Sequence, residues 1–169
     1  MQQANFTFLN SRSKFRKSEK FDLIKGKPID LVEIYFDGGS RGNQNNYSIA
    51  GSGSLLKVNG ETIVECVTSL GNTTNNVAEY TGLIMGLFMA TRLENVKRIE
   101  VYGDSNLVIQ QMAGRFRVKN EGLQKMNQIA KDFKSKLNAP VIFKHIPREN
   151  NKEADALSNK GMDLNSEYK

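Results

Sequence analysis

The fold of this 169-residue chain is predicted first from the segment IAGSGSLLKVNGETIVECVT, residues 49–68. It contains two runs of strand-forming residues, Ile49 to Val58 and Thr62 to Thr68, with Asn59 and Gly60 between them. An Asn-Gly pair suits the positive φ angles of a tight hairpin turn. The two runs therefore predict neighbouring antiparallel strands.

Further strands and helices surround this hairpin. Before it, Leu31 to Phe36 predicts a strand that ends at the turn-forming sequence Asp37-Gly38-Gly39. After it we expect strands at Arg98 to Tyr102 and Val141 to Ile146. Helical periods predict helices at about residues 76–92, 106–112, 123–137 and 151–160, the last stopped by Gly161. This order predicts an α/β fold, a five-stranded mixed sheet whose first three strands are antiparallel, flanked by about four helices.

We expect a single folded domain, since the chain length is close to the commonest domain size. Residues 1–28 carry seven Lys or Arg and two Asp or Glu without a sustained period, which predicts a flexible basic extension outside the core. The main domain is expected at residues 29–163. A short C-terminal tail follows at residues 164–169.

The composition excludes several kinds of site. Lys and Arg number 24 against 18 Asp and Glu, and this charge of +6 favours a polyanionic partner. Cys66 and His145 are the single cysteine and histidine, so an intrachain disulfide and a four-ligand zinc site are excluded, and oxygen must hold any metal. No apolar run is long enough to cross a bilayer. We expect a soluble, intracellular protein without a membrane partner.

Two carboxylates stand at the ends of predicted strands. Asp37 directly follows one predicted strand and Asp104 follows another after a single glycine, and ligands gather at such strand ends in α/β sheets. Taken singly, each would be an ordinary solvated or capping residue. Whether these two carboxylates belong to a binding site must be judged from the motifs that contain them.

Four motifs appear in order along the chain. They are Phe36-Asp37-Gly38-Gly39-Ser40-Arg41-Gly42, Thr74-Asn75-Asn76-Val77-Ala78-Glu79-Tyr80, Tyr102-Gly103-Asp104-Ser105 and Pro147-Arg148-Glu149-Asn150-Asn151-Lys152-Glu153-Ala154-Asp155. Together they resemble type 1 ribonuclease H, in its compact branch without the basic protrusion. The resemblance spans about Leu31 to Gly161 and implies a ribonuclease H-like catalytic domain.

The resemblance implies a two-metal centre held by Asp37, Glu79, Asp104 and Asp155. Asp37 would bridge two Mg²⁺ ions, with Mn²⁺ as a substitute; Glu79 and Asp104 would hold the ion on the leaving-oxygen side, and Asp155 the ion that carries the attacking water. Hard divalent ions prefer oxygen ligands, and a metal pair can activate water and stabilise both reacting oxygens. Arg148 is the expected auxiliary catalytic residue. His145 is interpreted as a packed structural residue of the last strand.

The resemblance also assigns substrate contacts. A ribonucleotide is recognised at its 2′-hydroxyl, which demands close backbone approach and small polar groups. Gly38, Gly39 and Ser40 would give that approach, Asn75, Asn76 and Asn151 would contact sugar or base edges, Thr74 would hold a phosphate, and Arg115, Arg117 and Lys119 would contact phosphates from a loop. Better-known members carry an arginine where Asn72 stands here.

We expect a monomeric endonuclease that cuts the RNA strand of RNA/DNA hybrids, leaving 5′-phosphate and 3′-hydroxyl ends. Three alternatives stay open: a catalytically weak or inactive nucleic-acid-binding module, a nuclease that tolerates RNA duplexes, and a domain of reverse-transcriptase origin beside a partner.

Overall fold

The computed structural model describes residues 2–42 and 48–166, which contain one mixed sheet in the order β1-β4-β3-β2-β5-β6. The strands are β1 (Ser13–Lys17), β2 (Val32–Gly42), β3 (Ser48–Val58), β4 (Glu61–Leu70), β5 (Ile99–Gly103) and β6 (Val141–His145). The helices are α1 (Gln2–Ser11), α2 (Glu19–Leu23), α3 (Asn75–Ala90), α4 (Asn106–Met112), α5 (Glu121–Ser135) and α6 (Lys152–Ser166), with a 3₁₀ turn η1 (Arg148–Asn150).

The predicted hairpin is confirmed. β3 and β4 pair antiparallel, and the turn residues Asn59 and Gly60 have φ angles of 53° and 77°. β2 also pairs antiparallel with β3, whereas β2, β5 and β6 are parallel. The expectation of a mixed sheet whose first three core strands are antiparallel is therefore correct.

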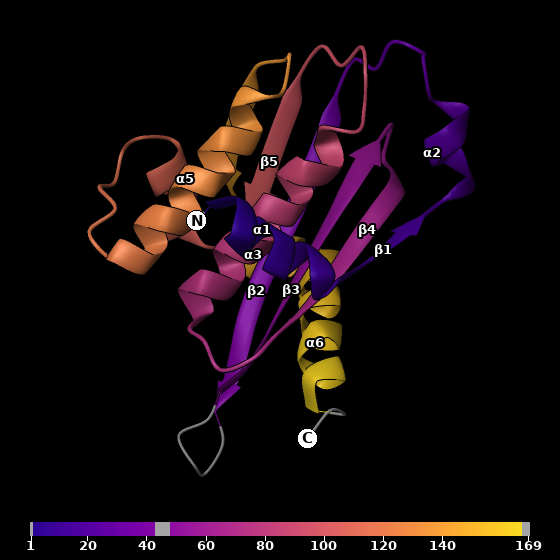
Figure 1. Ribbon diagram of the computed structural model, residues 1–169. Coiled ribbons are helices and arrows are strands. Elements are labelled where there is room, and N and C mark those ends of the chain that lie inside the picture. Colours follow the sequence, from indigo (N-terminus) through magenta and orange to yellow (C-terminus); the bar gives the residue numbers. More distant parts are fainter. Residues whose placement is uncertain (1, 43–47, 167–169) are drawn as a thin grey trace.

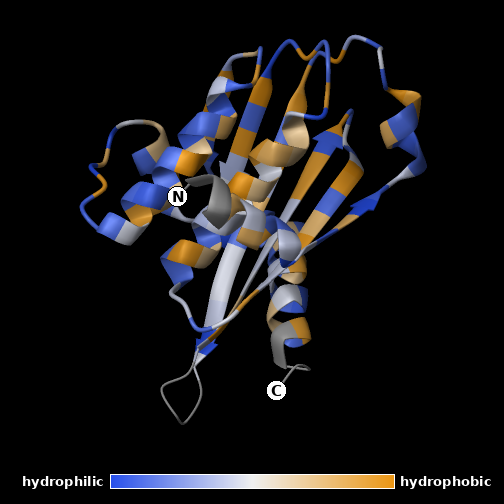
Figure 2. Ribbon diagram, viewed as in Figure 1, coloured by the Kyte–Doolittle hydropathy of each residue, from blue (hydrophilic) through white to orange (hydrophobic). Residues whose placement is uncertain are grey.

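Helices cover both faces of the sheet (Figure 1). α3 packs on β2 and β3 with α5 beside it, and α6 packs on the other face against β2, β3 and β4. α3 is buried along most of its length and is mainly pale to orange in Figure 2. α5 carries more blue because it buries one face only, through residues such as Ile129 and Phe133. α3 is therefore the central helix of the core.

The prediction of five strands and about four helices is wrong at the N-terminal end. The predicted extension forms α1, β1 and α2, and β1 pairs antiparallel with β4 from Ser13↔Thr68 to Lys17↔Val64. The Phe6 ring of α1 meets that of Phe133 with centroids 4.7 Å apart. β1 has no apolar alternation because it is a short edge strand rich in Lys and Arg, which hides it from pattern analysis. The domain boundary at residue 28 stays a prediction.

The turn predicted at Asp37-Gly38-Gly39 is also wrong. β2 continues through these residues to Gly42, because β3 pairs with it as far as Gly42↔Ser48. The glycines at this point permit close packing rather than a turn. Asp37 therefore lies inside a strand.

The last helix does not stop at Gly161 as predicted but reaches Ser166. Gly161 is buried against β4, where a Cβ atom would overlap the carbonyl oxygen of Thr68. The glycine thus allows α6 to pack closely on the sheet, and it does not end the helix. Of the predicted tail, residues 164–166 belong to α6, and residues 167–169 lie outside the described part of the chain.

None of the described helices has both the length and the hydropathy needed to cross a membrane.

Candidate metal centre

Four carboxylates from four different elements line one pocket of about 770 Å³. They are Asp37 on β2, Glu79 on α3, Asp104 directly after β5 and Asp155 on α6. All four carboxylates that the sequence singled out thus reach the same pocket.

Parallel pairing of β2 with β5 puts Asp37 beside Asp104. The last residues paired between these strands are Phe36 and Gly103, so the next residue on each chain segment is a carboxylate. At this level β5 ends, whereas β2 continues beside β3. The pocket therefore opens at the carboxyl end of β5, which is where α/β sheets commonly bind ligands.

Close packing of α3 on β2 brings Glu79 to Asp37. A Cβ atom at Gly38 would overlap the backbone of Ala78 and Glu79, so only a glycine permits this approach. Gly38 therefore determines how near the Glu79 carboxylate lies to Asp37.

The carboxylates are crowded without matching positive charge. Burial, and after it the negative charge of Asp104, raises the pKa of Asp37 to about 7. Burial also raises the pKa of Glu79 to about 10, with the charges of Asp37 and Asp104 as the next causes. The Glu79 Oε2 atom is buried and has no hydrogen-bond partner among the described residues. These carboxylates therefore repel one another when they are ionised.

A divalent metal ion fits this arrangement. One carboxylate oxygen from each of Asp37, Glu79 and Asp104 lies within 4.8 Å of the other two. No Lys or Arg of the described chain forms an ion pair with these three residues. Hard divalent cations prefer oxygen ligands, and their charge would relieve the repulsion that raises both pKa values.

Asp155 lies at the margin of this compact group of three. Its side chain is close enough to Asp37 to contribute to the raised pKa of that residue. The Arg148 Nη2 atom is 3.6 Å from Asp155 Oδ1, and the Arg148 side chain is 80% exposed. Arg148 can therefore meet an anion in the pocket while it stays near Asp155.

Some predicted substrate residues line the same pocket, namely Gly38, Gly39, Ser40 and Asn75. The Ser40 N–H and hydroxyl both donate to Asn75 Oδ1, at 2.9 Å and 2.8 Å, which ties β2 to the start of α3. Thr74 caps α3 by accepting a hydrogen bond from the Val77 N–H at 3.3 Å. Asn76 is half-buried and does not line the pocket.

Asn151, a predicted substrate contact, lies inside the protein. Its side chain is 1% exposed, and its Nδ2 donates to the Phe36 carbonyl at 2.9 Å. This bond joins the start of α6 to the strand that carries Asp37. The structure therefore gives Asn151 a positioning role, and its contact with a bound strand stays a prediction.

Replacing Asn151 by Ala should lower the free energy of unfolding by about 1–3 kcal/mol, because the Phe36 carbonyl loses its buried donor. Thermal unfolding measures this loss. Asn150→Ala is the matched control, since Asn150 is exposed and adjacent. A variant with wild-type stability but a strongly raised KM would contradict the positioning role.

Arg115, Arg117 and Lys119 do not line the pocket. They lie on the exposed loop between α4 and α5, where Arg115 Nη1 donates to Gln110 Oε1 at 3.1 Å. Phe116, between the two arginines, is 46% exposed. Phosphate binding by this loop stays a prediction.

The interpretation of His145 as a packed residue is wrong. The residue ends β6, its side chain is exposed, and it lines the carboxylate pocket with Nε2 3.3 Å from the Asp104 carbonyl oxygen. The short strand ends one residue earlier than predicted, because its parallel partner β5 ends at Gly103, the residue that pairs with His145.

Sequence reasoning also missed two residues that face the pocket. The Ser158 hydroxyl donates to Asp37 Oδ2 at 3.3 Å, and Arg41 pairs with Asp163 and Asn159 of α6. Ser158 could have been found, since it follows Asp155 by three residues and so shares its helix face. Nothing in the sequence links Arg41 to α6.

Asn72, which stands where better-known family members carry arginine, has a structural partner here. Its Oδ1 accepts a hydrogen bond from the Ser48 N–H at 3.0 Å. The side chain thus joins the segment before α3 to the start of β3, and no positive charge stands at this position.

Comparison with known proteins shows which family this chain resembles. The reverse transcriptase-like family matches residues 36–161. A ribonuclease HI of Halobacterium salinarum is 34% identical over 162 residues, which cover 86% of this chain and 77% of that protein.

A bifunctional protein of Mycobacterium tuberculosis is 39% identical over 134 residues, covering 78% of this chain. The match takes up 35% of that protein, so the chain spans about a third of the length of this relative. Among solved structures, LC11-RNase H1 in complex with an RNA/DNA hybrid is 36% identical, with a TM-score of 0.70, covering 79% of this chain and 97% of that one.

Proposed function

The chain belongs to the ribonuclease HI group of the reverse transcriptase-like family, and we propose that it is an endonuclease that hydrolyses the RNA strand of RNA/DNA hybrids. The products would carry 5′-phosphate and 3′-hydroxyl ends. One observation carries the proposal: Asp37, Glu79 and Asp104 hold carboxylate oxygens within 4.8 Å of one another without a paired cation from the described chain. A module that only binds nucleic acid gains nothing from such repulsion.

Asp37, Glu79, Asp104 and Asp155 would hold two divalent ions, with Mg²⁺ as the proposed metal and Mn²⁺ as a substitute. When bound, such ions activate water, neutralise the charge that develops on the phosphate and stabilise the departing oxygen. The chain supplies all four carboxylates itself, so a monomer suffices. Ser158 orients Asp37 through its hydroxyl, and Arg148 stands at the pocket entrance where it can attract the phosphate backbone.

The same pocket offers groups suited to a ribose. Ser40 and Asn75 lie on its wall and are held rigidly against each other. Gly38 and Gly39 also line the pocket, with the Cβ side of Gly38 filled by α3 and that of Gly39 by Met162. A shallow groove that displays 2′-hydroxyls requires close approach of such backbone. We assign RNA-strand recognition to these four residues. The neutral Asn72 leaves selection of the partner strand weaker, so cleavage of RNA duplexes is the second candidate activity.

The proposed activity is tested by incubating labelled RNA/DNA hybrid, RNA duplex and DNA duplex with the protein and Mg²⁺. We expect cleavage of the RNA strand of the hybrid, slower cleavage of the RNA duplex and none of the DNA duplex. If no substrate is cut with Mg²⁺ or Mn²⁺, the chain is a nucleic-acid-binding module instead.

Metal binding should also be visible without substrate. About 10 mM Mg²⁺ is expected to raise the midpoint of thermal unfolding by about 2–5 °C, since an ion bound only by the folded state stabilises it. Differential scanning fluorimetry in EDTA and in Mg²⁺ measures the shift, with NaCl added to equal ionic strength as the control. An equal shift in an Asp37→Asn variant would mean that the ion binds elsewhere.

A further inference from the structure

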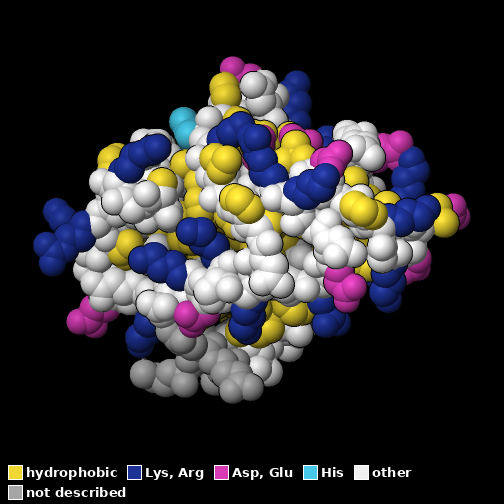
Figure 3. Space-filling model, turned by 90° about the horizontal axis from the view of Figure 1, so that it is seen from above, with side chains coloured by type: hydrophobic (Ala, Val, Ile, Leu, Met, Phe, Trp, Pro, Cys, Tyr) yellow, Lys and Arg dark blue, Asp and Glu magenta, His cyan; other side chains and the backbone are white. Residues whose placement is uncertain are grey.

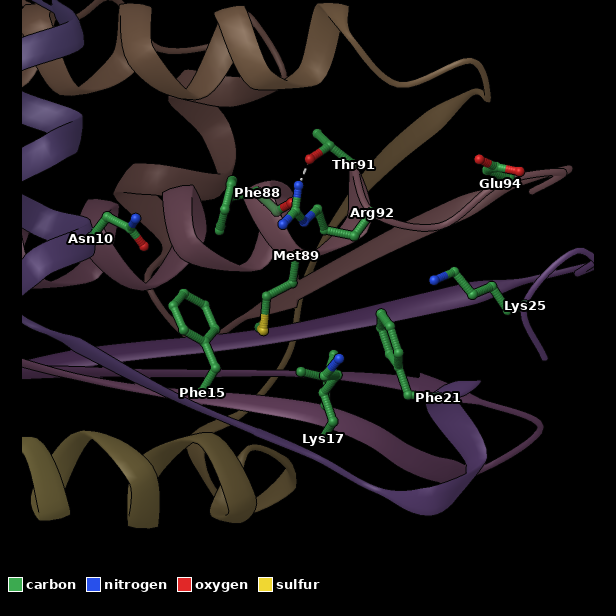
Figure 4. A pocket seen from close by; sticks show the side chains of 11 residues that line it. Asn10, Phe15, Lys17, Phe21, Lys25, Phe88, Met89, Thr91, Arg92 and Glu94 are labelled. Carbon is green, nitrogen blue, oxygen red and sulfur yellow. Dashed lines mark hydrogen bonds between the residues drawn. The ribbon is translucent and has the colours of Figure 1, made fainter. Parts of the chain in front are cut away.

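A second cavity, of about 610 Å³, lies between the N-terminal segment and the C-terminal end of α3 (Figure 4). Buried Val64, Met89 and Phe21 form its apolar base. Lys17 and Lys25 come from the N-terminal segment, and α3 and the residues just after it supply the opposite wall. We call this cavity the N-terminal groove.

Aromatic rings and cations alternate around the N-terminal groove. Phe15 on β1 is 41% exposed, and its ring centroid is 5.9 Å from that of Phe88. Lys17 Nζ lies 5.1 Å from the centroid of the Phe21 ring. Arg92 Cζ lies 5.7 Å from the centroid of the Phe88 ring. The groove therefore offers an exposed ring face with positive charge beside it.

The three cations of the groove are available to a ligand. Among the described residues, Lys17, Lys25 and Arg92 form no ion pair, whereas the nearby Lys20 pairs with Glu61. One carboxylate, the exposed Glu94, lines the same cavity, which leaves a surplus of two positive charges. On the end of the molecule where α2 lies, Figure 3 shows Lys and Arg side chains among exposed hydrophobic and acidic ones. This charge favours an anionic partner.

The groove is separate from the carboxylate pocket, and its N-terminal wall lies outside the part of the chain that matches the family. The family match begins at residue 36, after the strand and helix that carry Phe15, Lys17 and Phe21. Glu79 and Phe88 lie nine residues apart on α3, about 13 Å along the helix axis. One wall of the groove thus comes from outside the family match, whereas the wall formed by α3 and the residues after it lies inside that match.

We propose that the N-terminal groove binds single-stranded nucleic acid, with an unpaired base stacked on Phe15 and backbone phosphates held by Lys17, Lys25 and Arg92. Sites for single strands combine these two features, aromatic platforms and a positively charged groove. A duplex hides the faces of its bases and so cannot use an exposed ring. A neutral apolar ligand would leave three cations without partners at the rim.

The test is the binding of fluorescein-labelled oligothymidylate and oligouridylate to the full chain in EDTA, followed by anisotropy. The Lys17→Gln/Lys25→Gln variant should bind both probes at least about fivefold more weakly, and the slope of log affinity against log salt should fall by about 1.4, since each lost phosphate contact removes about 0.7. Lys14→Gln/Lys27→Gln is the matched control, because both lysines are exposed, lie in the same segment and do not line the groove. It should change affinity less than about twofold.

The Phe15→Ala variant separates stacking from charge. It should weaken binding at least about fivefold while the salt slope stays unchanged, because a base contact releases no counterions. Circular dichroism and the unfolding midpoint verify the fold of each variant. Equal losses in the groove and control variants, or no binding of either probe by the wild-type protein, would overturn the proposal. A difference between the two probes would decide between RNA and DNA as the ligand.

EDTA keeps this test independent of hydrolysis. If the protein cuts hybrids but binds neither single-stranded probe, only the proposal for the N-terminal groove is disproved. If the protein binds the single-stranded probes but cuts no substrate, only the proposed nuclease activity is disproved.

Discussion

We expect the Asp37→Asn variant to lose hydrolysis of the RNA strand by at least about 10³-fold while it folds as stably as the wild-type protein or more so. Removal of a single group that stabilises transition-state charge commonly costs that much. Asn keeps the volume of the side chain and removes a buried negative charge beside Asp104, whose repulsion raises the Asp37 pKa. In metal-free buffer the unfolding midpoint should therefore stay level or rise, as often happens when a strained active site is relaxed.

Initial rates on labelled hybrid and thermal unfolding in EDTA measure the two effects. Asp30→Asn is the matched control, since its carboxylate is 87% exposed and pairs with Lys97 at the surface. It should leave the rate within about twofold of wild type, because an exposed ion pair contributes little. Wild-type activity in Asp37→Asn, with its fold intact, would exclude Asp37 from the reaction.

The Gly38→Ala variant should fail for a different reason. The added Cβ would overlap the backbone of Ala78 and Glu79, and no side-chain rotation can relieve a clash with backbone. α3 must then move away from β2, at a cost of about 2–4 kcal/mol in the free energy of unfolding. The shift also carries Glu79 away from Asp37, and a misplacement of about 1 Å can reduce the rate about 10²-fold.

Denaturant unfolding and hybrid cleavage test this variant. Gly42→Ala on the same strand is the control, because a Cβ there meets nothing within 4 Å. The control should be unchanged in both measurements. A Gly38→Ala protein as stable and active as the Gly42→Ala protein would show that close packing of α3 on β2 is not required.

The catalytic half of the molecule was predictable because its signals are local. The hairpin turn at Asn59 and Gly60 is determined by two residues, and α3, capped by Thr74, begins close to the predicted residue 76. Once β2 and β5 are known to be parallel, Asp37 and Asp104 must lie side by side. Asp37 and Asp104 thus followed from short stretches and one pairing rule, whereas Glu79 and Asp155 were predicted from the resemblance of their motifs to type 1 ribonuclease H.

The rest depends on contacts between distant segments. β1 pairs with a strand about 50 residues later, and its Lys and Arg give no periodic pattern. Gly38 and Gly161 read as turn or stop residues in sequence, yet each is present because another backbone passes against it. The exposure of His145 depends on where β5 ends. None of these features can be predicted from a short stretch of sequence.

The position of β1 also has a consequence during protein synthesis. Among the described strands of this sheet, β1 is synthesised before the others and lies at the edge, and its partner β4 ends at Leu70. Until that residue has emerged, the basic segment has nothing to pair with, and long-range pairing of this kind is slow to form. The four carboxylates on the later segments follow in order, and Asp155 comes last. A nascent chain therefore carries its cationic N-terminal segment well before it can assemble the carboxylate pocket, so binding of polyanions by that segment would precede the proposed cleavage.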